Sequence, residues 1–205
     1  MMKEKNFKCE LISWNKFWRL SRNLSFKVKE SGFKPDVIVA IGRGGWIPAR
    51  VLSDFLNIFN LASIKIEHYY KGARMQKEAI IKHPLNVDIK GMNVLVVDDV
   101  SDTGDTLMLA YDHIKAFSPS KVKFAVLQHK QVSSFIPHYY ATKIVKWRWI
   151  IYPWAIVEDV SDFVEVMKDR PGTVEGIRKR LEQDFGLKIR MSVLSDVLKA
   201  SEVFI

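Results

Sequence analysis

The sequence predicts an α/β fold in which a mostly parallel β-sheet is flanked by helices. Two apolar runs, 37–41 and 94–97, are continuous rather than alternating, which is typical of strands covered on both faces. Helical periodicity follows each run, over 46–56 and from Leu107 to Ile114. Because crossover helices connect parallel strands, this strand-helix-strand order predicts a sheet with helices on both faces.

The composition is that of a globular protein with one well-formed core. The chain has 205 residues, of which 48% are hydrophobic and 27% are charged. A single cysteine excludes an intramolecular disulfide and fits a reducing compartment. No apolar run reaches about 18 residues, and residues 1–5 lack the apolar region of a signal peptide. We therefore expect a soluble, cytoplasmic protein with no membrane partner.

The net charge of +9 raises the question of nucleic-acid binding. Lysine and arginine residues are spread along the whole chain rather than gathered in one arm. A basic surface of this kind is usually just solvated, and it would also attract a small polyanionic substrate. Charge alone therefore does not predict a nucleic-acid partner.

Capping and turn residues bound the first elements. Ser13 can cap a helix over 13–31, and Gly32 can end it. Residues 42–45 form a glycine-rich turn after the first strand, and 62–67 is a second strand.

The middle of the chain alternates between regular and irregular segments. Residues 68–78 are polar, basic and aromatic without a period, which predicts an exposed, mobile loop. A short strand over 78–81 and a longer one over 121–127 are expected. The stretch 128–160 is less regular and rich in aromatic residues.

The pattern of the C-terminal region predicts a separate helical segment. Pro171 and Gly172 mark a boundary, and Ser192 can cap a last helix. The helix before it carries one apolar stripe, formed by Val174, Ile177, Leu181 and Phe185. We expect a main domain over 1–165, with an aromatic hood formed largely by 128–160, and a helical extension over 172–205.

Chemistry is concentrated at the end of the strand that begins at Val94. Asp98 and Asp99 follow four apolar residues, and two carboxylates at a strand end can accept the vicinal hydroxyls of a ribose. They can also hold Mg²⁺, which prefers oxygen ligands and keeps several waters. The alternative without a binding role is a pair of solvated aspartates in a turn.

The loop over 101–106 has the features of a phosphate site. Gly104 permits a positive φ and close backbone approach, while Thr103 and Thr106 carry hydroxyl donors. Free backbone N–H groups and the dipole of the following helix favour an anion. Asp102 can serve as a helix cap here, and that role is compatible with a catalytic one.

The run from Val94 to Thr106 resembles the phosphoribosyl pyrophosphate (PRPP) signature of the type I phosphoribosyltransferases. The resemblance implies a 5′-phosphate cradle that includes Asp102 to Gly104 and Thr106, with Asp105 at a variable position. It also implies that Asp98 and Asp99 bind the ribose and Mg²⁺. In purine-using members, the aspartate that matches Asp102 lies beside N7 of the base and acts as a general acid or base.

The glycine-rich turn Gly42-Arg43-Gly44-Gly45 fits the same family. A dinucleotide-binding fingerprint would need a third glycine where Ile47 stands. In the phosphoribosyltransferases, the loop after the first strand binds pyrophosphate through backbone N–H groups and a basic side chain, here Arg43. Members often have a non-proline cis peptide there, and Gly42-Arg43 is the corresponding bond.

The family also implies a lid and a base site. By position, 68–78 resembles a flexible loop in which Tyr69 or Tyr70, with Lys71, Arg74 and Lys77, closes over pyrophosphate. A solvated basic loop is the alternative.

Lys130 and the segment 149–154 resemble the hood of the xanthine-guanine phosphoribosyltransferases and their archaeal relatives. The resemblance implies that Trp149 stacks on the base, that the backbone at Ile150 reads its edge and that Lys130 donates to a 6-oxo group. Relatives carry an acidic residue shortly after the Pro-Trp pair, where this chain has Ala155-Ile156-Val157. Glu158 and Asp159 come later, so a second metal site and the choice between an oxopurine and adenine stay open.

The implied activity is purine salvage. The 5-phosphoribosyl group would pass from PRPP to a purine base, giving a nucleoside monophosphate and pyrophosphate, with Mg²⁺ as cofactor. The family also suggests a homodimer. A competing hypothesis is a PRPP- or nucleotide-sensing regulator of the same fold that binds DNA through the basic helices near 173–200.

Overall fold

The computed structural model describes residues 7–71 and 76–201, and the chain divides into two compact units. The larger unit is Trp18–Trp147, and the smaller unit joins Met1–Phe17 to Arg148–Ile205. Each unit has its own apolar core and is considered by itself. The larger unit confirms the predicted α/β class.

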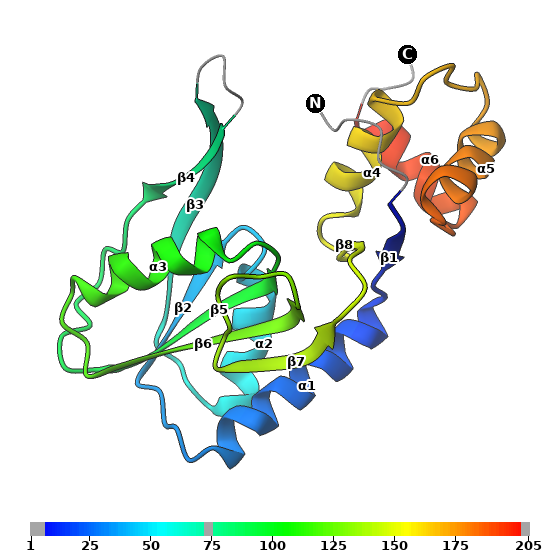
Figure 1. Ribbon diagram of the computed structural model, residues 1–205. Coiled ribbons are helices and arrows are strands. Elements are labelled where there is room, and N and C mark those ends of the chain that lie inside the picture. Colours follow the sequence, from blue (N-terminus) through cyan, green and yellow to red (C-terminus); the bar gives the residue numbers. More distant parts are fainter. Residues whose placement is uncertain (1–6, 72–75, 202–205) are drawn as a thin grey trace. The chain divides into compact units, whose positions relative to one another are not determined.

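A six-stranded sheet forms the centre of the larger unit, in the order β4-β3-β2-β5-β6-β7 (Figure 1). Its strands are β2 (Val37–Gly42), β3 (Leu61–Lys71), β4 (Gln76–His83), β5 (Asn93–Ser101), β6 (Lys121–Lys130) and β7 (Tyr139–Ile144). All neighbours pair in parallel except β3 and β4, which are antiparallel. The carboxyl ends of β2, β5 and β6 therefore meet at one edge of the sheet.

Helices cover both faces of this sheet, with α3 (Asp105–Lys115) on one and α2 (Trp46–Leu56) on the other (Figure 1). The α3 face is fully apolar at its centre, where Leu107, Ala110 and Ile114 share a core cluster with β2, β5 and β6. The side chains along β2 are buried at every position, as the continuous apolar run predicts.

The helix α1 (Trp14–Glu30) confirms the predicted capping. The Ser13 hydroxyl accepts a hydrogen bond from the Lys16 N–H at 3.2 Å, and Gly32 has the positive φ of 72° expected at a helix end. The helix runs beside β7 in the larger unit (Figure 1), where Lys27 Nζ donates to the Tyr140 carbonyl at 2.8 Å.

Residues 68–78 were expected to form a mobile loop, and the described part of this segment instead extends a β-hairpin. The strands β3 and β4 continue their pairing through Tyr69↔Glu78 and Tyr70↔Lys77 to Lys71↔Gln76. The prediction was wrong because backbone ladder hydrogen bonds do not need an alternating side-chain pattern. Residues 72–75, which include Arg74 of the expected lid, lie outside the described residues.

The smaller unit combines a two-stranded parallel sheet, β1 (Cys9–Leu11) with β8 (Trp149–Ile151), and three helices. The helices are α4 (Ile156–Glu165), α5 (Val174–Phe185) and α6 (Met191–Ala200). Thr173 caps α5 by accepting from the Gly176 N–H at 3.1 Å, and Gly186 ends it with a φ of 66°. The helix α6 begins at Met191, one residue before the predicted cap Ser192.

The expected domain boundary near 165–172 does not coincide with the division between the units. Val160 and Phe163 of α4 share one apolar core with Ile177 and Leu181 of α5 and with residues of α6. The helix α4 therefore belongs with the C-terminal helices. The expected hood is split as well, because β7 extends the main sheet and 149–160 lies in the smaller unit.

Candidate active site

The glycine-rich turn after β2 lies against Asp99 on β5. A Cβ added to Gly44 would lie 2.5 Å from Asp99 Oδ2, and one added to Gly45 would lie 2.3 Å from the Val97 carbonyl oxygen. A larger residue at Gly45 would displace backbone, and one at Gly44 would displace the Asp99 carboxylate. The absence of side chains thus allows this turn to lie directly against Asp99.

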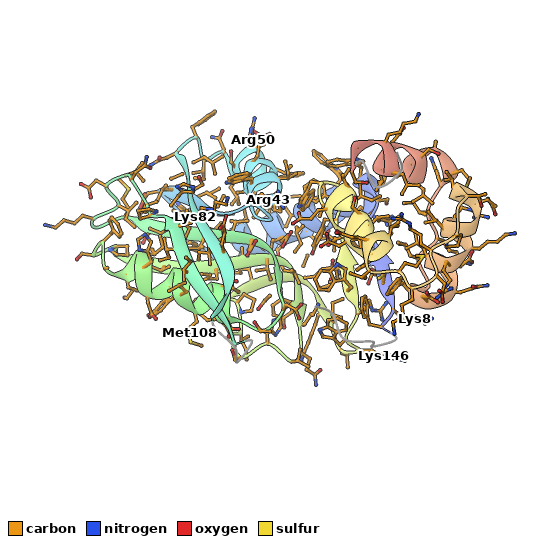
Figure 2. The ribbon with its side chains drawn as sticks, turned by 90° about the horizontal axis from the view of Figure 1, so that it is seen from above. Lys8, Arg43, Arg50, Lys82, Met108 and Lys146 are labelled. Atoms are coloured by element: carbon orange, nitrogen blue, oxygen red, sulfur yellow. The ribbon has the colours of Figure 1, made fainter. Side chains whose placement is uncertain are left out.

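The turn also presents backbone groups and a basic side chain at the amino end of α2. The Gly42-Arg43 peptide bond is cis, as the resemblance implies. Arg43 is exposed and lies just before the helix (Figure 2). The first turn of α2 has no acidic residue, so the helix dipole and Arg43 together favour an anion there.

Asp98 and Asp99 were expected at the end of the strand; they lie within β5, which continues to Ser101. Asp98 is 8% exposed, and its Oδ1 accepts a hydrogen bond from the Asp99 N–H at 2.9 Å. Burial and the neighbouring Asp99 charge raise the pKa of the Asp98 carboxyl well above its ordinary value. A buried carboxylate beside a second one is a site that a bound cation would stabilise.

The loop between β5 and α3 has the geometry of an anion cradle. Gly104 has a φ of 102°, and a Cβ there would lie 2.6 Å from the Phe135 nitrogen. The helix α3 starts at Asp105, so its free N–H groups face this loop. Thr103 Oγ1 donates to Asp105 Oδ2 at 2.9 Å, so the Asp105 carboxylate has a partner within the loop. Thr106 follows in the first turn and is half-buried.

Two serines that sequence reasoning missed brace this cradle from the segment after β6. The Ser134 backbone N–H and hydroxyl both donate to the Thr103 carbonyl, at 2.8 and 2.9 Å. The hydroxyl oxygens of Ser101 and Ser133 lie 2.7 Å apart in a buried contact. The polar Ser-Ser turn following Lys130 was the available signal, although a turn by itself does not show what it contacts.

Lys130 and Asp102 are brought together because they follow neighbouring positions on parallel strands. Ser101 of β5 is paired with His129 of β6, so the next residue of each chain segment comes to the same edge. Lys130 Nζ lies 2.7 Å from Asp102 Oδ2. The lysine side chain is 2% exposed and that of the aspartate is 36% exposed.

Trp147 completes this group and was not predicted from the sequence. Its Nε1 donates to Asp102 Oδ1 at 3.1 Å, and Lys130 Nζ lies 4.4 Å from the centroid of its ring. The aromatic crowding of 139–154 was visible in the sequence. Nothing in the spacing identified which tryptophan would lie beside Asp102.

Trp149 and Ile150, the expected base contacts, lie in the smaller unit. The Trp149 ring is 6.4 Å from Phe7 and 6.4 Å from Phe163, centroid to centroid, in the apolar core of that unit. Ile150 is paired with Glu10 of β1. Within the larger unit, Trp147 is the tryptophan that contacts Asp102 and Lys130. Stacking by Trp149 therefore stays a prediction.

The other predicted site residues are in β3, where only their backbone is described, or in the smaller unit. Tyr69 and Tyr70 are in β3, and the structure describes their pairing but not their side chains. Glu158 and Asp159 form the first turn of α4 in the smaller unit. In the part of the chain that the structure describes, no group of three or more His, Cys, Asp or Glu side chains forms a metal site.

One protein family and several known proteins are similar to this chain. The family model described as phosphoribosyl transferase domain matches residues 10–159. Xanthine-guanine phosphoribosyltransferase of Ruegeria sp. is 33% identical over 158 residues, covering 70% of this chain and 83% of that protein. Hypoxanthine-guanine phosphoribosyltransferase of Saccharomyces cerevisiae is 30% identical, covering 71% of this chain and 85% of that protein.

Solved structures share the fold. A purine phosphoribosyltransferase from Pyrococcus horikoshii matches with a TM-score of 0.64 and 35% identity, covering 72% of this chain and 93% of that one. A Neisseria gonorrhoeae protein with bound ppGpp matches with a TM-score of 0.66 and 28% identity, covering 74% of this chain and 91% of that one. Residues beyond 159 lie outside the family match.

Proposed function

The chain belongs to the phosphoribosyl transferase domain family, and from that premise we propose that it is a purine salvage enzyme. It transfers the 5-phosphoribosyl group from PRPP to a purine base, releasing a nucleoside monophosphate and pyrophosphate. This makes it a glycosyltransferase of the pentosyltransferase class. The observation that carries the proposal is the convergence of the acidic pair, both glycine-containing loops and the Lys130–Asp102 pair at one sheet edge.

Each part of PRPP has a chemically matched partner in this arrangement. We assign the ribose hydroxyls to Asp98 and Asp99, since carboxylates accept hydrogen bonds from both. The 5′-phosphate is assigned to the N–H groups and hydroxyls of 102–106 at the start of α3. The pyrophosphate is assigned to the turn 42–45, where Arg43 and the amino end of α2 offer positive charge.

Mg²⁺ fits the acidic pair and is proposed as the cofactor. The raised pKa of the Asp98 carboxyl reflects negative charge that is buried without enough compensation. Mg²⁺ is commonly held by one or two carboxylates together with substrate oxygens and waters, so two protein ligands suffice. When bound, it neutralises charge on the pyrophosphate leaving group. Tyr69 or Tyr70 is assigned to closure over the reacting groups, which excludes water.

Asp102 and Lys130 are the proposed groups for the base. Asp102 holds or receives a proton at N7 of the purine, a general acid-base role worth about 10²–10⁴ in rate. The Lys130 ammonium is a donor without acceptor capacity, so it matches a 6-oxo group and opposes the 6-amino group of adenine. We therefore favour hypoxanthine, guanine or xanthine as the substrate.

The setting of the enzyme is also proposed. We infer a cytoplasmic homodimer, which rests on the family and on the single cysteine. None of the helices in the described residues is long and apolar enough to cross a membrane.

Nothing in the fold or the comparisons supports the DNA-binding alternative. Two basic side chains of α5 form ion pairs with acidic neighbours on the same helix. Arg178 lies 2.9 Å from Glu175, and Arg180 lies 2.8 Å from Asp184.

A turnover assay with four bases in parallel tests the proposal. Adenine, hypoxanthine, guanine and xanthine are each supplied with PRPP and Mg²⁺, and pyrophosphate release is measured. We expect release with at least one 6-oxopurine and little with adenine. Absence of release with every base would refute the enzyme, whereas turnover of adenine alone would refute only the role given to Lys130.

A further inference from the structure

We propose that Trp147 is a positioning residue. It fixes Asp102 for proton transfer at N7 of the purine and Lys130 for donation to the 6-oxo group. This inference rests on the proposed function, because it gives Trp147 a role only through those two side chains. Its basis is a closed arrangement in which each of the three side chains contacts the other two.

Both oxygens of the Asp102 carboxylate have a donor in this arrangement. Lys130 Nζ lies 2.7 Å from Oδ2, and Trp147 Nε1 lies 3.1 Å from Oδ1. Two donors on two oxygens fix the plane of the carboxylate, which a single contact would leave free to rotate. A general acid or base must keep its oxygen within hydrogen-bond reach of the proton that it transfers, so this orientation matters for rate.

Trp147 also contacts Lys130 directly, through the face of its ring. The Lys130 ammonium lies 4.4 Å from the centroid of the indole ring, although the lysine side chain is only 2% exposed. A cation–π contact is stronger when the cation is removed from water. When a purine draws the ammonium away from Asp102, the ring remains as a neutral partner that keeps it near the base.

The backbone explains how Trp147 reaches this place. The edge strand β7 is parallel to β6, and Ile144 is paired with Lys130. The Gln131 N–H donates to the Ile144 carbonyl at 2.9 Å, which ties the two strands together at their ends. Three residues later the chain presents Trp147 beside the end of β6. The same edge strand therefore sets the positions of Lys130 and of the ring that contacts it.

The Trp147→Phe variant tests the hydrogen bond separately from the ring, because phenylalanine keeps an aromatic face but has no N–H. We expect kcat with a 6-oxopurine to fall by about ten-fold, the effect of losing one hydrogen bond to a charged group. The KM for PRPP should stay within about two-fold of the wild-type value, since the phosphate loops are untouched. Trp147→Leu, which removes the ring as well, should lower kcat further.

Trp18→Phe is the matched control. Trp18 lies in the same unit, is 54% exposed and packs on Phe55 in a 5.1 Å ring contact. The control should leave both kinetic constants unchanged. It also provides a reference for fluorescence, because the wild-type minus Trp147→Phe difference spectrum isolates the emission of Trp147. Addition of GMP should change that difference spectrum and leave the corresponding Trp18 difference spectrum unchanged.

The outcomes separate this inference from the proposed function. Wild-type turnover with an unchanged kcat in Trp147→Phe would overturn the role of Trp147 and leave the enzyme intact. A rise in the KM for PRPP as large as the fall in kcat would show a general structural defect. That result would also overturn the positioning role of Trp147. Failure of the wild-type protein to release pyrophosphate with any base would overturn the proposed function itself, and the positioning role with it.

Discussion

At the scale of single residues, Asp102 is the side chain with the largest expected effect on rate. Asp102→Asn keeps an oxygen that can accept from Trp147 Nε1, but it removes the charge that pairs with Lys130 and the proton-transfer role. We expect kcat to fall by about 10²–10⁴ while PRPP still binds, because the phosphate loops remain. Steady-state kinetics and PRPP-induced thermal stabilisation measure the two effects. A kcat close to the wild-type value would remove Asp102 from catalysis.

Asp98 illustrates a conflict between stability and ligand binding. Because its pKa is raised in the folded state, the folded protein binds more protons than the unfolded chain above the ordinary carboxyl pKa of 3.8. Folding stability therefore falls as pH rises from 3.8 through the raised pKa, and the full cost remains above it. Asp98→Asn removes this charge and keeps an oxygen for the Asp99 N–H.

The Asp98→Asn protein should consequently melt at a higher temperature than the wild type without ligand at neutral pH. Adding Mg²⁺ and PRPP should stabilise the wild type more than the variant. Differential scanning calorimetry gives both comparisons. A lower melting temperature for the ligand-free variant would mean that the buried carboxylate is better compensated than its surroundings indicate.

Cys9 should be chemically inert. Burial, with the nearby Asp159 charge as a smaller cause, raises the pKa of its thiol to about 12. The reactive thiolate is therefore scarce at neutral pH. As the chain has one cysteine, labelling with a thiol reagent reports this site alone. We expect slow labelling of the native protein and fast labelling after denaturation; equal rates would contradict the assigned environment.

At the scale of elements, His113 links α3 to the segment before β5. Its Nε2 accepts a hydrogen bond from the Leu85 N–H at 3.0 Å, which requires a neutral ring, and burial lowers its pKa below the ordinary 6.5. The stability it contributes is complete above 6.5 and is lost as pH falls through the lowered pKa, because the unfolded chain takes up the proton first.

His113 should therefore stabilise the protein less at about pH 5.5 than at about pH 7.5, and this loss opposes the gain expected from Asp98. His113→Gln keeps an acceptor oxygen without a titrating ring, so its melting temperature relative to the wild type should rise as pH falls. Thermal unfolding at several pH values tests this. His129 and His138 also have lowered pKa values, so the difference between variant and wild type is compared rather than either profile alone. A difference that does not change with pH would contradict the role of His113.

The elements that sequence reasoning predicted best are those with a strong local pattern. The run Val37–Ile41 and the capping by Ser13 and Gly32 are determined by a few adjacent residues, and the structure confirms them. The hairpin beyond Glu67 has no such pattern, because its pairing is made by backbone groups of distant residues. The strand Trp149–Ile151 is only three residues long and was missed for the same reason.

In the candidate site, too, local motifs were predicted from the sequence, and contacts between strands were not. The proposed cradle at 102–106 lies in consecutive residues, and the family resemblance carried by such local motifs implied the cis Gly42-Arg43 bond that the structure has. Ser134 and Trp147 act across strands, and their partners are fixed only when β6 and β7 pair. Contacts of this kind depend on tertiary register, which a local pattern does not contain.

At the scale of the whole molecule, the chain combines a family domain with a second core. The family match ends at 159, yet α4 shares its apolar core with α5 and α6 in the smaller unit. The C-terminal helices therefore complete a unit to which the family segment contributes β8 and the start of α4. Removal of α5 and α6 would expose Val160 and Phe163, which are buried in the intact chain.

The central claim is that the sheet edge of the larger unit transfers a phosphoribosyl group to a purine. The most direct measurement follows PRPP, guanine, GMP and pyrophosphate together in one reaction with the wild-type protein and Mg²⁺. The account predicts that GMP and pyrophosphate appear in equal amounts as guanine is consumed, and that hypoxanthine gives IMP in the same way. Hydrolysis of PRPP without nucleotide formation, or no reaction with any 6-oxopurine, would contradict it.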